Sequence, residues 1–164
     1  MQVVTILGSN LGDKREILAE AIRQLSTVGK VVKMSSLYET EPWGFETEEY
    51  FLNQVVVFDT LLLPDEFLTY CLATEQRLGR VRDKQQKGYA SRPIDIDILF
   101  YDSLVLNRPN LIIPHPRLAQ RHFVLAPLNE IMPDFIHPVF HQTIATLLDA
   151  CTDQLKTKKI KMNE

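Results

Sequence analysis

The 164-residue sequence predicts an α+β fold with a ferredoxin-like β-α-β-β-α-β core, in which helices flank a mostly antiparallel sheet. Extra strands and helices are expected to follow this core. Apolar runs typical of strands alternate with two stretches of helical periodicity, and glycines and prolines separate these segments. A hydrophobic content of 45% over this length allows a sizeable core, so we expect a single domain spanning residues 1–164.

The first strand and helix occupy the first 25 residues. Val3–Leu7 is an apolar run that ends at the turn-rich segment 8–13, and apolar residues then recur at helical spacing from Lys14. Asp13 is a suitable N-cap because its carboxylate can accept hydrogen bonds from the first turn. This order is compatible with a phosphate loop and equally with a tight turn, since neither G-x-G-x-x-G nor G-x-x-x-x-G-K-[ST] is present.

The second and third strands flank an acidic loop that contains aromatic residues. We expect strands at Val31–Tyr38 and Phe51–Thr60, and segment 39–49 between them holds five glutamates. Trp43, the only tryptophan, either folds back on the core or forms an aromatic wall for a flat ligand. Asn53 either hydrogen-bonds the edge of an amide-like heterocycle or is a solvated edge residue.

A basic loop follows the second helix, which we expect to begin at Pro64 and to be followed by Gly79 as its C′ residue. Residues 80–92 carry five cations and one acid. No hydrophobic period runs from 83 to 91, which predicts a mobile surface loop that closes over bound phosphates. The alternative is an ordinary solvated charged face.

The most informative stretch is RPIDIDILFYD, residues 92–102. Ile94, Ile96 and Ile98 alternate with Asp95 and Asp97, so a strand would place both carboxylates on one face, about 7 Å apart. Strands disfavour aspartate, so a matched pair opposes local propensity. Because Mg²⁺ prefers oxygen ligands, the pair predicts a metal site for a nucleotide phosphate. The alternative is a half-buried strand with a solvated acidic face.

Shorter elements are expected after the core. Apolar segments lie at 104–106 and 111–113, a helix is entered at Phe123, and a last amphipathic helix covers 143–151. Between them, a second basic cluster is predicted to contact phosphate, consisting of His115, Arg117, Arg121 and His122. The polar tail at about 156–164 is expected to be frayed.

Composition narrows the classes of function. A net charge of −3 argues against a general nucleic-acid or membrane binder, and no apolar run approaches the length of a membrane span. Cys71 and Cys151 lie far apart and lack metal-binding spacing, as expected for reduced cysteines of a cytoplasmic protein.

Together these motifs resemble one enzyme family over nearly the whole chain. The matching pieces are LGSNLGD, YETEPWG, FLNQVV, EQRLGRVR, RPIDIDILFYD and PHPRLAQRHFVLAPL. The chain is similar to the 6-hydroxymethyl-7,8-dihydropterin pyrophosphokinases of folate biosynthesis. The resemblance implies an ATP- and Mg-dependent transferase that acts as a monomer. Such an enzyme moves the terminal pyrophosphate of ATP onto the hydroxymethyl group of 6-hydroxymethyl-7,8-dihydropterin and releases AMP.

The resemblance also implies the site residues. The family's metal-binding carboxylates match Asp95 and Asp97, with two Mg²⁺ ions expected beside ATP, and its catalytic arginines match Arg82 and Arg92. The ATP-binding positions match Glu75, Arg82, Tyr89, Arg92, Ile98, His115 and Arg121. The pterin-binding positions match Thr40, Pro42, Trp43, Phe51, Asn53 and Phe123, with Phe51 and Phe123 as the stacking pair.

Two other functions remain open on the sequence. One is a different Mg-dependent phosphotransferase or nucleotidyl transferase, and the other is a non-catalytic nucleotide-binding module of the same fold. Catalysis predicts AMP release that requires both Mg²⁺ and a pterin. A binding module predicts affinity for ATP without turnover.

Overall fold

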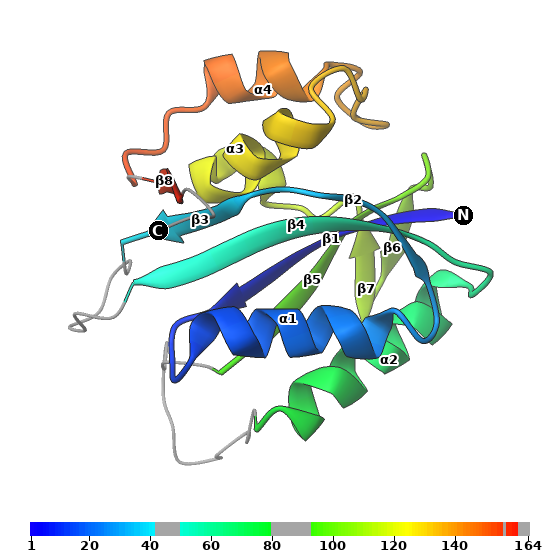
Figure 1. The fold of residues 1–164 in the computed structure, drawn as a ribbon. Coiled ribbons are helices and arrows are strands. Elements are labelled where there is room, and N and C mark those ends of the chain that lie inside the picture. Colours follow the sequence, from blue (N-terminus) through cyan, green and yellow to red (C-terminus); the bar gives the residue numbers. More distant parts are fainter. Residues whose placement is uncertain (42–49, 80–92, 156, 161–164) are drawn as a thin grey trace.

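A computed structural model describes residues 1–41, 50–79, 93–155 and 157–160 (Figure 1). Its central feature is a six-stranded sheet in the order β5-β1-β4-β3-β8, with β2 also paired to β4. The strands of this sheet are β1 Gln2–Ser9, β2 Lys30–Met34, β3 Leu37–Thr40, β4 Phe51–Asp59, β5 Asp95–Tyr101 and β8 Thr157–Ile160. Strands β6 Leu106–Arg108 and β7 Leu111–Ile113 form a separate two-stranded sheet.

Helices cover both faces of the large sheet (Figure 1). Helices α1 Lys14–Leu25 and α2 Pro64–Arg77 lie on one face, and α3 His122–Ile131 and α4 Ile144–Ala150 lie on the other. A short 3₁₀ helix, Leu118–Gln120, precedes α3. Each face has its own buried apolar cluster, because successive side chains of a strand point to opposite sides of the sheet.

The predicted ferredoxin-like core is confirmed, since β4 pairs antiparallel with β1 on one side and with β2 and β3 on the other. Asp13 caps α1 as predicted by accepting a hydrogen bond from the Glu16 N–H, and Gly79 follows α2 with a φ of 96°. Strand β1 runs through Gly8 to Ser9, beyond the predicted end at Leu7.

The single strand predicted at Val31–Tyr38 is instead two strands, β2 and β3. The interruption lies at Ser35, whose backbone N–H donates to the Val55 carbonyl oxygen at 2.9 Å. Its hydroxyl accepts a hydrogen bond from the Val55 N–H, also at 2.9 Å. A side-chain oxygen therefore takes the place of a backbone acceptor and breaks the regular ladder.

The tail also differs from the prediction, because Thr157–Ile160 is a strand paired antiparallel with β3 instead of a frayed segment. Its polar side chains have polar partners. Thr157 Oγ1 lies 3.2 Å from Thr40 Oγ1, and Lys159 Nζ lies 3.0 Å from Glu130 Oε2. The sequence therefore lacks the apolar alternation by which a strand is usually recognised.

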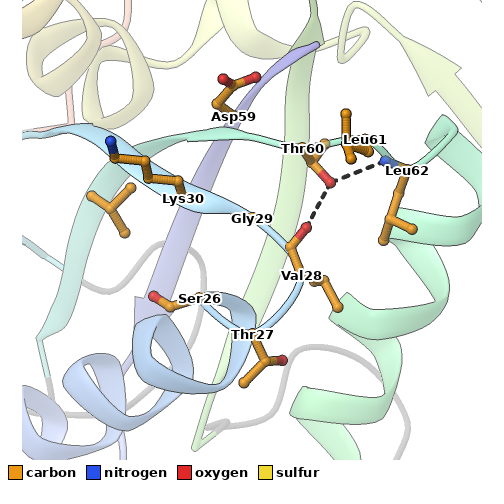
Figure 2. Close-up of a pocket in the computed structure, with 10 residues that line it drawn as sticks. Ser26, Thr27, Val28, Gly29, Lys30, Asp59, Thr60, Leu61 and Leu62 are labelled. Atoms are coloured by element: carbon orange, nitrogen blue, oxygen red, sulfur yellow. Dashed lines mark hydrogen bonds between the residues drawn. The ribbon is translucent and has the colours of Figure 1, made fainter.

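A shallow pocket of about 710 Å³ opens at the end of the sheet remote from Asp95 (Figure 2). Asp59 in its wall pairs with Gln2, whereas Asp95 pairs with Gly8, so β1 separates the two places by about 20 Å. Thr60 Oγ1 donates to the Val28 carbonyl oxygen at 2.7 Å and accepts from the Leu62 N–H at 3.1 Å. These polar groups stabilise the turn, and the pocket offers no reactive cluster.

Two further observations concern the length of the helices and the state of the cysteines. Within the described part of the chain, no helix has both the length and the apolar content needed to cross a membrane. Cys71 is buried and Cys151 half-buried, and both are free thiols.

Glu130 on α3 joins α3 to the edge of the sheet. Its carboxylate accepts hydrogen bonds from Ser36 N–H at 2.8 Å, Ser36 Oγ at 2.7 Å and Tyr38 OH at 3.3 Å, and it pairs with Lys159. Burial raises the pKa of this carboxyl, but the hydrogen bonds from Ser36 and Lys159 outweigh burial and hold the pKa below its ordinary value. The ionised form is therefore stabilised by folding.

We expect Glu130→Gln to lower the free energy of unfolding at neutral pH by about 1–3 kcal/mol, because it removes one charged acceptor from several donors. The folded-state pKa is depressed, so this contribution is present above about 4.5 and is lost as the pH falls through the folded-state value. Urea unfolding at pH 7 and pH 3.5 measures both effects. Asp149→Asn, an equal charge change on an exposed residue, is the control. A pH-independent difference between Glu130→Gln and the wild type would contradict the assignment.

Candidate active site

The two carboxylates of the RPIDIDILFYD segment lie on the α3 side of the sheet. Ile96 and Ile98 belong to the cluster packed beneath α1 and α2, so the alternating Asp95 and Asp97 face the opposite way. Both aspartates are half-buried, while the isoleucines beside them are buried. Two carboxylates are thereby held on a rigid strand at one end of the sheet.

A single row of residues crosses the sheet at the level of Asp95. Asp95 pairs with Gly8 on β1, Gly8 pairs with Asn53 on β4, and Asn53 pairs with Tyr38 on β3. Because neighbouring strands are about 4.8 Å apart, Asn53 and Asp95 are separated by about 10 Å. Gly8 lies between them and has no side chain. A Cβ at this position would lie 2.5 Å from Asn53 Oδ1, so the Asn53 amide extends over Gly8.

The residues predicted to bind the pterin that fall within the described chain collect on β3, β4 and the start of α3. Asn53 and Thr40 are buried, with 6% and 2% of their surface exposed, and Phe51 at the start of β4 is half-buried. Phe123 lies in the first turn of α3 and packs against the apolar cluster of that face. A polar amide can bind the edge of a flat heterocycle, and aromatic rings can stack on its faces.

Of the residues predicted to bind ATP that the structure describes, Glu75, Ile98 and His115 lie on or beside β5, away from β3. Glu75 on α2 is 4% exposed, and its Oε2 accepts a hydrogen bond from the Ile96 N–H at 2.7 Å. The His115 N–H donates to the Leu99 carbonyl oxygen at 3.0 Å. The Arg121 guanidinium carbon lies 5.6 Å from the centre of the Phe123 ring, so a residue predicted to bind ATP is next to one predicted to bind the pterin.

His115 is uncharged at neutral pH, unlike the arginines beside it, because its pKa is lowered. Burial, followed by the positive charges of Arg121 and Arg117, lowers the pKa of His115 to about 4, against an opposing effect of Asp95. Its Nδ1 accepts a hydrogen bond from the Arg117 N–H at 3.2 Å. His115 is therefore neutral at pH 7 and carries its proton on Nε2, where it can donate to an oxygen.

Burial, with Glu75 and Asp97 nearby, raises the pKa of the Cys71 thiol. This thiol is fully buried in α2 and stays protonated at neutral pH. Its contribution is to the packing beneath β5.

Six predicted site residues are not placed at the site by the structure: one faces the core, and five lie outside the described part of the chain. The side chain of Ile98 is 5% exposed and packs in the α1–α2 cluster, so it does not reach the face that carries Asp95 and Asp97. Only the backbone of Ile98 could contact a ligand on that face. The predicted site residues outside the described part of the chain are Pro42, Trp43, Arg82, Tyr89 and Arg92. The mobile loop predicted at 83–91 lies outside it as well.

Gly8 is a site residue that the sequence analysis did not single out. The sequence predicts a turn at Gly8, but this residue lies within β1, where its missing side chain makes room for Asn53. A glycine inside a strand often marks a close approach of another group. Reading VVTILGS as one strand would have given that signal.

The carboxylates fit a hard cation. Asp95 and Asp97 supply oxygen donors on one face, and Mg²⁺ is usually held by one or two carboxylates with water and phosphate completing the shell. Among the described residues there is no group of three or more His, Cys, Asp or Glu side chains that could hold a metal ion. Phosphate and water would therefore have to supply the other ligands.

An α+β domain that carries two carboxylates on one strand face, beside a histidine–arginine cluster, is compatible with a phosphotransferase. The model of the family described as 7,8-dihydro-6-hydroxymethylpterin-pyrophosphokinase (HPPK) matches residues 4–133. The chain belongs to this family, which confirms the resemblance predicted from the motifs.

Individual relatives agree. A Porphyromonas gingivalis protein named 2-amino-4-hydroxy-6-hydroxymethyldihydropteridine pyrophosphokinase is 44% identical over 134 residues, which are 80% of this chain and 90% of that protein. Folic acid synthesis protein fol1 of Pneumocystis carinii is 42% identical over 148 residues, 90% of this chain and 20% of fol1. The fold matches the crystal structure of Plasmodium falciparum HPPK-DHPS with pteroate, with a TM-score of 0.72 and 18% identity. That match covers 91% of this chain and 44% of the longer one.

We expect Gly8→Ala to weaken pterin binding by roughly 1–3 kcal/mol, because the added Cβ would displace the Asn53 amide, which is predicted to bind the edge of the ring. Isothermal titration calorimetry with a pterin measures the affinity. Asn53→Ala should weaken binding similarly, and Gly8→Ala should have little further effect in that background. Additive losses in the double variant would show that Gly8 does not act through Asn53.

We expect the imidazole of His115 to titrate near pH 4 in the folded protein, with the proton on Nε2 above that pH. Its ordinary pKa is 6.5, so its contribution to stability is complete above about 6.5 and is lost as the pH falls toward 4. Side-chain ¹⁵N NMR reports both the midpoint and the tautomer. Arg121→Gln should raise the midpoint by removing a neighbouring cation. A midpoint near 6.5 in the wild type would contradict the burial of His115 between these charges.

Proposed function

We propose that this chain transfers the terminal pyrophosphate of ATP to the hydroxymethyl group of 6-hydroxymethyl-7,8-dihydropterin, releasing AMP, through the residues on the α3 side of the sheet. Pyrophosphoryl transfer in folate biosynthesis is the activity of the family to which the chain belongs. The observation that carries the proposal is the row Asp95–Gly8–Asn53. Along this row, a carboxylate proposed to hold a metal ion and an amide proposed to bind the heterocycle lie on one face of the sheet, two strand spacings apart.

The reaction forms a bond between the pterin hydroxymethyl oxygen and the β-phosphorus of ATP. The bond from that phosphorus to the oxygen bridging the α- and β-phosphates breaks, AMP leaves with this oxygen, and the hydroxyl proton passes to solvent. Attack in line with the leaving group requires both substrates to be held in a fixed orientation. Asn53, Phe51 and Phe123 would hold the ring, and the outer edge of β5 would hold the nucleotide.

Two Mg²⁺ ions, held by Asp95 and Asp97, would neutralise phosphate charge and favour departure of AMP when bound. Neutral His115 would donate from Nε2 to a nucleotide oxygen, and Arg121 would supply positive charge nearby. Arg82, Arg92 and Tyr89 are proposed as further ATP contacts, and Pro42 and Trp43 as further pterin contacts, on the motif resemblance alone.

The setting of the reaction is part of the proposal. We propose that the protein acts as a monomer in the cytoplasm on these two small molecules, without a nucleic-acid or membrane partner. The buried free thiol of Cys71 is consistent with a reducing compartment. Light scattering coupled to gel filtration, with and without substrates, tests the monomer.

The decisive experiment is a coupled assay for AMP, supplied with ATP, Mg²⁺ and 6-hydroxymethyl-7,8-dihydropterin. We expect AMP release only when all three are present, and turnover lower by orders of magnitude in Asp95→Asn and Asp97→Asn, because each removes a charged metal ligand. Circular dichroism and thermal melting should show that both variants fold. Affinity for ATP without AMP release would favour the non-catalytic binding module. Near-normal turnover of folded Asp97→Asn would refute the two-metal assignment.

A further inference from the structure

The carboxy-terminal strand β8 lies outside the part of the chain that matches the family model, which ends at residue 133. In the structure this strand is nevertheless the outer neighbour of β3 and ends the large sheet on that side (Figure 1). The register is Thr40 with Thr157 and Tyr38 with Lys159. Directly paired residues of antiparallel strands point to the same face, so Thr157 and Lys159 share the α3 side with the proposed pterin pocket.

Thr157 contacts a residue of that pocket directly. Its Oγ1 lies 3.2 Å from Oγ1 of Thr40, and Thr40 is 2% exposed. Thr40 in turn pairs with Phe51, which is half-buried at the start of β4. The row Thr157–Thr40–Phe51 thus extends from β8 to a proposed stacking residue and contains one partly buried pair of hydroxyl groups.

Lys159 acts one row further along. Its Nζ lies 3.0 Å from Glu130 Oε2, and the same carboxylate accepts a hydrogen bond from Tyr38 OH at 3.3 Å. Tyr38 is 7% exposed and pairs with Asn53. Burial, together with Glu130, raises the pKa of Tyr38 to about 12, so its hydroxyl keeps the proton that it donates. The row Lys159–Tyr38–Asn53 therefore links β8 to the residue proposed to bind the heterocycle edge.

We propose that β8 is a positioning element of the pterin half of the site, with Thr157 and Lys159 as its positioning residues. The inference deepens the proposed function and rests on it. Neither residue touches the substrate. Thr157 fixes the Thr40 side chain behind Phe51, and Lys159 fixes the Glu130–Tyr38 pair beside Asn53. The effect is confined to the pterin because the ATP-side residues Glu75 and His115 lie on the opposite edge of the sheet.

The test compares point variants of the full chain. Thr157→Val removes the hydroxyl at nearly constant size, and Lys159→Met removes the charge while keeping the apolar stem. Thr157→Ser and Lys159→Arg retain the polar group and should restore the wild-type values. Lys158→Met is the matched control, because it makes the same charge change on the same strand at an exposed position that points to the other face.

The readouts are KM for each substrate, kcat, and the Kd of 6-hydroxymethyl-7,8-dihydropterin with α,β-methylene-ATP and Mg²⁺ present. We expect Thr157→Val and Lys159→Met each to raise KM and Kd for the pterin about fivefold, the scale of one lost hydrogen bond. KM for ATP should stay within twofold, and Lys158→Met should match the wild type. Thermal melting identifies a variant that loses stability.

Other outcomes overturn the inference. Equal losses for both substrates in proportion to a lowered Tm would mean that β8 only stabilises the sheet. Unchanged pterin affinity in both Thr157→Val and Lys159→Met, with a wild type that releases AMP, would refute the inference and leave the proposed function intact. A wild type that binds pterin but releases no AMP would refute the proposed function, while the Kd comparison would still decide the role of β8.

Discussion

The burial of one face of β5 is the constraint on which the site depends. Ile94, Ile96 and Ile98 are fully or almost fully buried in the cluster beneath α1 and α2. Each buried isoleucine contributes about 1.5–3 kcal/mol, which exceeds the cost of placing two aspartates in a strand. A slip of one residue would exchange the isoleucines with Asp95 and Asp97. The apolar core therefore fixes the direction in which the two carboxylates point.

A missing side chain is as important to the site as those present. At Gly8 the strand carries no Cβ, and the Asn53 amide occupies the space that a side chain would take. Two strands away, Tyr38 is fixed by Glu130. Asn53 on β4 thus lies between Gly8 on one neighbouring strand and the hydrogen-bonded Tyr38 on the other. An amide held in this way would bind a flat ligand, as proposed for Asn53, without the ordering of many side chains.

The sequence predicts the helices and strands that follow from hydrophobic periodicity. It does not predict elements whose position depends on polar contacts with distant parts of the chain. Alternation revealed the strand of Asp95 and Asp97, and helical spacing revealed α1 and α2. The break at Ser35 depends on a hydroxyl that replaces a backbone acceptor of Val55, which no local pattern encodes. Strand β8 was missed because Thr157 and Lys159 find partners on β3 and α3 that are more than 25 residues away in the chain. Ile98 matched a nucleotide position by motif, yet its side chain belongs to the core.

At the end of the sheet where the site lies, β5 and β3 both have hydrogen-bonded partners on their outer sides, and this keeps the strands that carry the site rigid. On the outer side of β5, the Glu75 carboxylate accepts a hydrogen bond from the Ile96 N–H. The His115 N–H donates to the Leu99 carbonyl oxygen on the same strand. At the β3 edge, β8 supplies a paired strand. Unpaired strand edges fray and pair with other chains. Since the pterin is proposed to lie over β4 and the nucleotide beside β5, contacts that hold β3, β4 and β5 in register also fix the distance between the groups that must react.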